Sequence, residues 1–148
     1  MKILMVCLGN ICRSPIAHGV MNHLVKKEGL DWEIDSAGTG GYHIGQQPDL
    51  RSIAVAKKRG IDISAHKARK FITADFKRFD QIFVMDNNNY SAVVSLTDEA
   101  KERAKVKLFI PDAAVQDPYF DDVLFEPVFE QIITQCEKLL KHLKKENE

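Results

Sequence analysis

The chain of 148 residues has no net charge, few cysteines and no long apolar run. Lys plus Arg and Asp plus Glu number 21 each, so charge gives no reason to expect nucleic acid or an anionic membrane as a partner. Three cysteines, an odd number, do not match the disulfide framework of a secreted domain. The apolar run at 3–8 is too short for a signal peptide, and no stretch approaches a membrane span. We therefore expect a cytoplasmic monomer with no nucleic-acid or membrane partner.

Short apolar segments alternate with segments of helical periodicity along the chain. Four runs rich in aliphatic and aromatic residues predict buried strands, at 3–6, 32–37, 81–85 and 106–110. Helices are expected after them, over 14–29, 49–59, 97–104 and 125–144. In the second helix, Leu50, Ile53 and Ala54 are expected to face inward. Asp86 to Asn89 is interpreted as a turn that ends the third strand and caps a helix.

This alternation predicts the fold class and points to the site. Strand and helix alternating four times indicate an α/β three-layer sandwich, with a four-stranded parallel sheet flanked by helices on both faces. No linker or repeat divides the chain, so a single domain over 1–148 is expected. Ligands of open parallel sheets bind beyond the carboxyl ends of the strands. Three polar segments lie there: 7–14, 36–42 and 116–120.

The first of these segments has the composition of a phosphate-binding loop. Gly9 and Asn10 tolerate left-handed backbone angles, so the loop can curl with its N–H groups inward. A ring of amides at a helix N-terminus binds anions, and Arg13 can add a bidentate contact to two phosphate oxygens. The predicted phosphate-binding residues are Leu8, Gly9, Asn10, Ile11, Cys12, Arg13 and Ser14.

Cys7 begins this loop and is the predicted nucleophile. The positive field that holds a phosphate also stabilises a thiolate, and the Ser14 hydroxyl can donate to the sulfur. A thiolate that faces a bound phosphorus atom is already in position to attack it. The sequence therefore predicts a phosphocysteine intermediate on Cys7, with Arg13 holding the phosphate.

The third segment supplies a candidate general acid, Asp117. Pro118 restricts Asp117 to an extended backbone, which would steady a carboxyl group on a loop. That group could protonate the leaving oxygen and, once ionised, activate water against the phosphocysteine. Tyr42 and Tyr119 are expected to form aromatic walls of the cleft, which would favour a flat phenyl phosphate over a serine phosphate.

In combination, these residues resemble the signature of the low-molecular-weight protein tyrosine phosphatases. The segment 6–15, Val-Cys-Leu-Gly-Asn-Ile-Cys-Arg-Ser-Pro, carries most of the resemblance. Four further motifs of that family follow in order, at 35–39, 66–69, 84–86 and 117–119. A cysteine and an arginine six positions apart would be weak evidence alone, but the ordered set is specific. The resemblance implies hydrolysis of phosphotyrosine in protein substrates, with no metal and no organic cofactor.

The resemblance also implies supporting roles that the residue types alone do not. Asn10, Ser36 and His66 would form a hydrogen-bond network that holds the shape of the loop. Cys12 would pair with Cys7 under oxidation, although a spectator thiol remains equally open.

At two positions the chain departs from the family pattern. Phe120 and Asp121 stand where a second tyrosine and a glycine are common. Regulation by phosphorylation of that second tyrosine is therefore in doubt, and Asp121 adds negative charge near the rim.

Other interpretations fit less well. Relatives that reduce arsenate pass electrons to cysteines in the middle of the chain, and none lies between Cys12 and Cys136. A phosphotyrosine-binding module that does not cut would lack Cys7 or Asp117. Some relatives act on phosphoarginine or sugar phosphates, and the loop alone does not separate these substrates.

Four residues outside the motifs receive simple assignments. Cys136 is expected to pack in the core. Three histidines in helices are expected on solvated faces rather than in a metal site: His18, His23 and His142.

Overall fold

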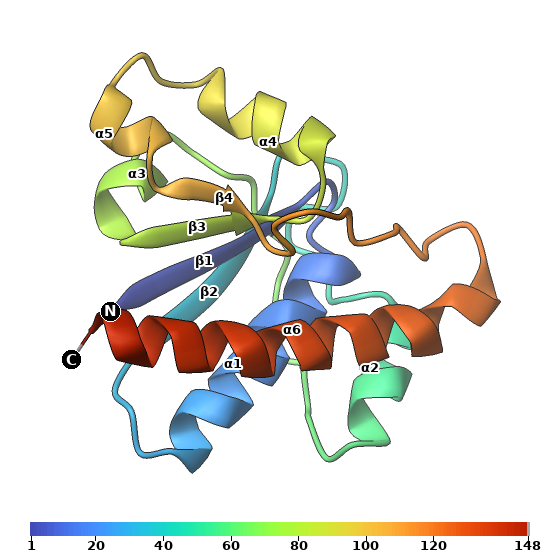
Figure 1. Cartoon of the computed structure of the whole chain (residues 1–148). Helices are drawn as coiled ribbons and strands as arrows, with labels where there is room; N and C mark the ends of the chain where they lie inside the picture. Colours follow the sequence, from blue (N-terminus) through green and yellow to red (C-terminus); the bar gives the residue numbers. More distant parts are fainter. Residues whose placement is uncertain (148) are drawn as a thin grey trace.

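A parallel β-sheet lies between two layers of helices in the computed structural model, which describes residues 1–147 (Figure 1). The strands are β1 (Lys2–Cys7), β2 (Glu33–Gly38), β3 (Gln81–Val84) and β4 (Val106–Leu108). Their order is β2-β1-β3-β4, and each neighbouring pair is parallel. The α/β fold class predicted from the alternating pattern is confirmed.

Both faces of the sheet are covered by helices (Figure 1). On one face lie α1 (Arg13–Lys27), α2 (Leu50–Lys57) and α6 (Phe125–Glu146), the last preceded by the 3₁₀ turn η1 (Asp122–Leu124). The other face carries α3 (Asp75–Arg78), α4 (Asn87–Val94) and α5 (Ala100–Arg103). Within residues 1–147, no helix combines the length and apolar character needed to cross a membrane.

The central strand β1 divides the core into its two halves. Successive side chains of a strand point to opposite faces, and β1 is apolar on both. Ile3 and Met5 join the cluster formed with α1, α2 and α6, whereas Leu4 and Val6 join the cluster beneath α3 and α4. Cys7 continues the first set, so its side chain lies on the side of the sheet that α1 covers.

Helix α2 is rotated relative to the expectation. Leu50 is 69% exposed and Ala54 is also exposed, whereas Ile53 packs partly buried against the core, as expected. The buried residues of the helix are Ser52, Val55 and Ala56. The backbone N–H of Asp49, the N-cap of α2, donates to the Ile11 carbonyl at 2.9 Å. This bond to a distant loop helps to fix the rotation of the helix, and helical periodicity alone does not contain it.

Of two further expectations, one is met only in part and the other is met. The charged stretch 97–104 is helical only over Ala100–Arg103, where no side chain is buried to hold a longer helix. The turn after β3 does cap a helix, because the Asp86 carboxylate accepts from the Asn89 N–H at 2.8 Å at the start of α4.

Candidate active site

The loop between β1 and α1 turns its carbonyl groups outward. The carbonyl oxygens of Cys7, Leu8 and Ile11 each accept a 2.9 Å hydrogen bond from a backbone N–H of a neighbouring segment. A trans peptide places its N–H opposite its carbonyl, so the amides that follow these carbonyls point into the loop. At Gly38 of β2, an added Cβ would lie 2.7 Å from the Leu8 oxygen, so a glycine is needed for this close approach.

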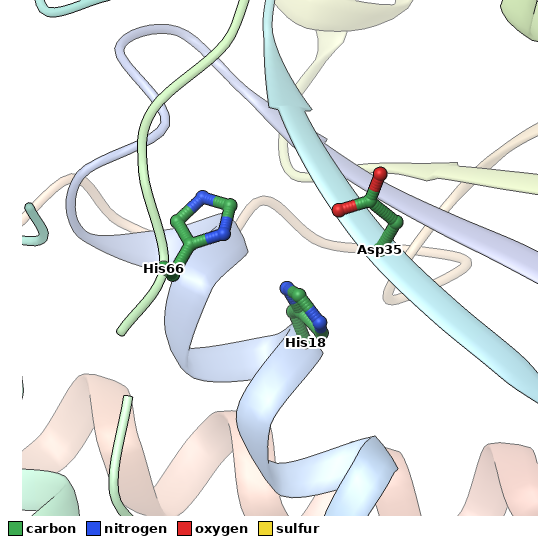
Figure 2. A group of neighbouring side chains, drawn as sticks. All are labelled: His18, Asp35 and His66. Atoms are coloured by element: carbon green, nitrogen blue, oxygen red, sulfur yellow. The ribbon is translucent and has the colours of Figure 1, made fainter. Parts of the chain in front are cut away.

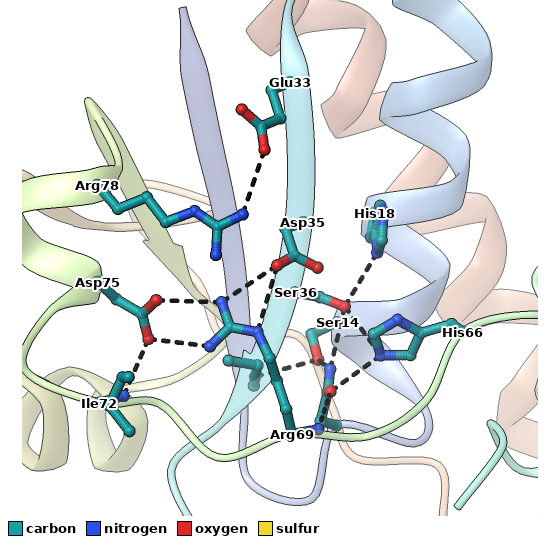
Figure 3. Close-up of polar contacts among 12 residues, drawn as sticks. Ser14, His18, Glu33, Asp35, Ser36, His66, Arg69, Ile72, Asp75 and Arg78 are labelled. Atoms are coloured by element: carbon teal, nitrogen blue, oxygen red, sulfur yellow. Dashed lines mark hydrogen bonds and ion pairs between the residues drawn. The ribbon is translucent and has the colours of Figure 1, made fainter. Parts of the chain in front are cut away.

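Asn10 holds the loop from its centre. Its backbone lies in the left-handed region, with φ of 58°, and the residue is fully buried. The amide nitrogen donates to Ser14 Oγ at 2.8 Å and to Ser36 Oγ at 3.1 Å. The amide oxygen accepts from the Arg69 N–H at 3.0 Å and lies 2.9 Å from His66 Nε2 (Figure 3). The structure thus brings together the three residues of the network that the family resemblance implied.

Cys7 lies at the end of this hydrogen-bond network. Its Sγ lies 3.0 Å from Ser14 Oγ, and both residues are buried. Because Ser14 Oγ accepts from the Asn10 amide, its hydrogen is left for another acceptor. The two acceptors in reach are the Cys7 sulfur and, at the longer distance of 3.5 Å, the Ala37 carbonyl. The Ser14 hydroxyl is therefore the neighbouring group that can donate to the sulfur predicted as the nucleophile.

The guanidinium of Arg13 is fixed by acceptors from two distant segments. Nη1 donates to Asp86 Oδ2 at 2.7 Å and to the Val115 carbonyl at 3.0 Å, and the side chain is only 4% exposed. Burial by itself would lower the pKa of Arg13, but the negative charges of Cys7, Asp86 and Asp117 raise it above its ordinary value. Arg13 therefore stays charged beside the loop, with a fixed orientation.

Asp117 lies across the same cavity from the loop. Its Oδ2 is 3.7 Å from Arg13 Nη2, and its Oδ1 accepts from the Tyr119 N–H at 3.1 Å. The cavity has a volume of about 200 Å³. Both Tyr42 and Tyr119 line it, although Tyr42 is 74% exposed and contributes only at the rim. Nucleophile, arginine and candidate acid thus share one cavity.

Two aromatic residues of this cavity were not singled out from the sequence as its walls. His43 lies beside Tyr42, with its ring 6.3 Å from that of Tyr119, and Phe120 stands 5.0 Å from Tyr119 at the opening. Phe120 lies in the same short segment as Asp117 and Tyr119, so its place in the sequence could have indicated that it borders the cavity. His43 had no such signal beyond its place next to Tyr42.

Arg51 ties the segment that carries Asp117 to helix α2. Its Nη2 donates to the Tyr119 carbonyl at 3.0 Å, and its Nη1 lies 2.5 Å from Asp122 Oδ1. Asp49 binds the same guanidinium at 2.8 Å and 2.9 Å, and the guanidinium stacks 4.5 Å from the centre of the Phe125 ring. Sequence patterns do not indicate this role, because every partner of Arg51 except Asp49 is remote in the sequence.

His18 does not lie on a solvated face, so that expectation is wrong. It is half-buried, and with Asp35 and His66 it offers ligand-type atoms within 4.8 Å of one another (Figure 2). These groups already have partners: His18 contacts Ser36, His66 contacts Asn10, and Asp35 binds the positively charged Arg69 at 3.2 Å. We therefore interpret the group as part of the hydrogen-bond network and assign no metal to it.

The other two cysteines are also buried, and all three are free. Cys12 lines the cavity with Cys7, and burial raises its pKa to about 12, so it remains a thiol at neutral pH. Cys136 packs in the core beneath α6, as expected, and burial likewise raises its pKa.

A larger hollow lies elsewhere on the molecule. It has a volume of about 820 Å³ and lies between β4 and the end of α6, with Leu108, Phe109 and Leu139 among its lining residues. None of the residues predicted for catalysis borders it. Size alone would have pointed to this hollow, but the reactive groups are gathered in the smaller cavity.

The chain is similar to known proteins over nearly its whole length. The family model described as low molecular weight phosphotyrosine protein phosphatase matches residues 2–148. A protein of that name from Schizosaccharomyces pombe is 46% identical over 128 residues, which cover 80% of this chain and 81% of the relative. A crystal structure of a protein tyrosine phosphatase from Entamoeba histolytica, with Hepes in its active site, is 37% identical with a TM-score of 0.92, covering 100% and 99% of the two chains. A Drosophila arginine phosphatase structure is 36% identical with a TM-score of 0.88, covering 97% and 98%.

Proposed function

This chain belongs to the low molecular weight phosphotyrosine protein phosphatase family and is a hydrolase, and on that premise we propose that it cleaves phosphotyrosine through Cys7. One observation carries the proposal. The Cys7 sulfur, the Arg13 guanidinium and the Asp117 carboxylate border a single cavity of about 200 Å³, at the mouth of a loop whose amides point inward.

In the first chemical step, Cys7 attacks the phosphorus atom. The S–P bond forms as the P–O bond to the tyrosine breaks, and Asp117 gives its proton to the leaving oxygen. Arg13 and the loop amides hold the phosphate oxygens, where charge builds up in the transition state. Arg13 suits this task because Asp86 and the Val115 carbonyl fix its orientation before a substrate binds.

In the second step, water replaces the sulfur. Asp117, now ionised, takes a proton from the water as its oxygen attacks phosphorus, and the S–P bond breaks to release phosphate and the Cys7 thiolate. The Ser14 hydroxyl, 3.0 Å from the sulfur, stabilises the departing thiolate. The cycle ends with Asp117 protonated and Cys7 ionised, as it began.

We also propose that the enzyme acts as a cytoplasmic monomer, with residues 1–148 as one phosphatase domain. The three free cysteines fit a reducing compartment, and every group of the proposed mechanism comes from one chain. The rings of Tyr42, Tyr119 and Phe120 at the rim favour an aryl phosphate in a protein substrate.

A substrate panel with a matched variant tests the function. Phosphotyrosine peptide, aryl phosphate, phosphoserine and phosphoarginine are compared without metal and with a thiol reductant. The parent is expected to prefer phosphotyrosine, and Cys7→Ser is expected to lose turnover while still binding phosphate or vanadate. Substantial turnover by Cys7→Ser would contradict the mechanism. A preference of the parent for phosphoarginine would keep the proposed mechanism but change the substrate, and would place the chain with the Drosophila protein named an arginine phosphatase.

A further inference from the structure

His18 lies one helical turn after Ser14, on the same face of α1. Residues four apart on a helix are neighbours on its surface, and both side chains reach the end of β2. His18 Nδ1 is 3.1 Å from Ser36 Oγ, and Ser36 Oγ is 3.1 Å from the Asn10 amide nitrogen (Figure 3). A continuous chain of hydrogen bonds therefore runs from His18 through Ser36, Asn10 and Ser14 to the sulfur of Cys7.

The directions of the hydrogen bonds around Asn10 follow from one fixed donor. The Arg69 backbone N–H can only donate, so the Asn10 atom that it meets at 3.0 Å is the amide oxygen. That oxygen can only accept, so His66 Nε2, 2.9 Å away, carries a hydrogen. The Asn10 nitrogen then donates to both serine hydroxyls, Ser14 and Ser36.

These assignments leave one acceptor for the hydrogen of Ser36. Its oxygen already accepts from Asn10, and His66 Nε2, at 3.3 Å, carries a hydrogen of its own. The remaining neighbour is His18 Nδ1, which accepts when the imidazole is neutral with its hydrogen on Nε2.

We propose that His18 is a positioning residue, whose Nδ1 lone pair orients the Ser36–Asn10–Ser14 chain so that Ser14 donates to the Cys7 sulfur. This inference rests on the proposed nucleophilic role of Cys7. A donor at position 18 would leave the Ser36 hydroxyl with two donors and no acceptor. The Ser36 hydrogen would then have only His66 Nε2 as an acceptor. That nitrogen accepts only when it carries no hydrogen, so it could no longer donate to the Asn10 oxygen. Asn10 has a left-handed backbone, so it depends on these side-chain bonds to keep its orientation.

The surroundings of His18 keep it in the required neutral form. Burial, followed by the nearby His66, lowers the pKa of His18 to about 4. The charged groups around it are Asp35 on β2, which favours protonation, and Arg69, which opposes it. At neutral pH the lone pair on His18 Nδ1 is therefore available to Ser36.

A pair of variants separates positioning from packing. His18→Leu fills the site without an acceptor, whereas His18→Asn places an amide oxygen where Nδ1 stood. His23→Leu, an exposed histidine on the same helix, is the control. We expect His18→Leu to lower kcat/KM for phosphotyrosine about fivefold, the effect of one lost hydrogen bond. We expect His18→Asn to recover most of this loss and His23→Leu to match the parent.

The second readout is the pH profile of Cys7 alkylation by iodoacetate, which reports the thiolate directly. His18→Leu is expected to move the midpoint of that profile to higher pH, and His18→Asn to return it. If all three variants keep the parent profile and kcat/KM, or if His18→Asn behaves as His18→Leu does, the positioning role is wrong. These results are read against the parent and Cys7→Ser: an inactive parent, or an active Cys7→Ser, overturns the proposed function instead.

Discussion

At the scale of single residues, Cys7 and Asp117 need opposite surroundings. Cys7 is buried at the base of the loop, with its sulfur 3.0 Å from the Ser14 hydroxyl. Asp117 stands at the opening, 3.7 Å from the guanidinium of Arg13, with contact to solvent. On the proposed function, a group at that position can reach the leaving oxygen in the first step and the attacking water in the second, whereas a group at the base of the loop could not.

The role of Asp117 predicts a dependence on the leaving group. Asp117→Asn keeps the size of the side chain but has no proton of suitable acidity to give. Hydrolysis of phosphotyrosine is expected to fall by about 10²–10³-fold, within the usual contribution of general acid catalysis. An activated nitrophenyl phosphate should lose far less, because its leaving group is stable without a proton. Rates across a series of aryl phosphates measure this, and a uniform loss would assign the proton to another residue.

Cys12 predicts a response to oxidants. It shares the cavity with Cys7, and its thiol could trap an oxidised Cys7 as a disulfide before further oxidation. We expect peroxide-treated parent to regain most of its activity with a thiol reductant, and Cys12→Ser to regain little. The measurement is recovered activity after matched inactivation, with the disulfide identified by mass spectrometry. Equal recovery in the two proteins would make Cys12 a bystander.

At the scale of elements, the segment that carries the acid has no regular structure of its own between β4 and η1. Its position depends on α2, through the Arg51 bonds to the Tyr119 carbonyl and to Asp122. Asp49 in turn connects α2 to the Ile11 carbonyl of the loop. The predicted nucleophile and the candidate acid lie far apart in the sequence, and the contacts of this short helix connect the two segments that carry them.

Removing the Arg51 side chain should impair protonation of the leaving group more than the other parts of the reaction. Arg51→Ala is expected to lower kcat for phosphotyrosine about three- to tenfold, since misplacing a catalytic group is costly even without unfolding. Activity on an activated aryl phosphate should change less. Arg59→Ala is the matched control. Arg59 likewise pairs with two carboxylates, those of Glu126 and Glu130, but both lie on α6 outside the segment that carries Asp117. Equal effects of the two variants would reduce Arg51 to a surface ion pair.

The sequence predicted those parts of the site that are local. Strand, loop and helix N-terminus follow one another within 2–15, so the loop and its nucleophile could be read from composition and spacing. The partners of Arg13 could not, because Asp86 and Val115 reach it only through the order of the strands. The inward face of α2 was predicted correctly only at Ile53, for the same reason. His18 appeared solvated because nothing in its helix indicates that Ser36 lies opposite.

For the whole molecule, the depressed pKa of His18 makes the fold sensitive to acid. Unfolding returns His18 to its ordinary value near 6.5, so between pH 4 and 6.5 the unfolded chain binds more protons than the folded one. Stability therefore falls as the pH drops through this window. After allowance for partial solvent contact, the contribution is on the order of 1–2 kcal/mol.

Chemical denaturation of the parent and of His18→Asn at pH 6.5 and 4.5 measures this contribution. The parent is expected to lose more unfolding free energy between the two values than the variant does. An identical loss in the two proteins would mean that other groups, such as the carboxylates paired with arginines, account for the whole acid sensitivity.

The inward amides and the fixed guanidinium exist before any substrate arrives, and this has a consequence for the life of the enzyme between turnovers. A cavity shaped for the phosphoryl group does not distinguish a phosphate ester from free phosphate. On the proposed function, the product phosphate therefore binds in the same loop as the substrate. Inorganic phosphate would then compete with the substrate for the loop and slow the enzyme. The same occupant would cover the Cys7 sulfur from peroxide and alkylating agents, so feedback by the product and protection of the nucleophile become one effect.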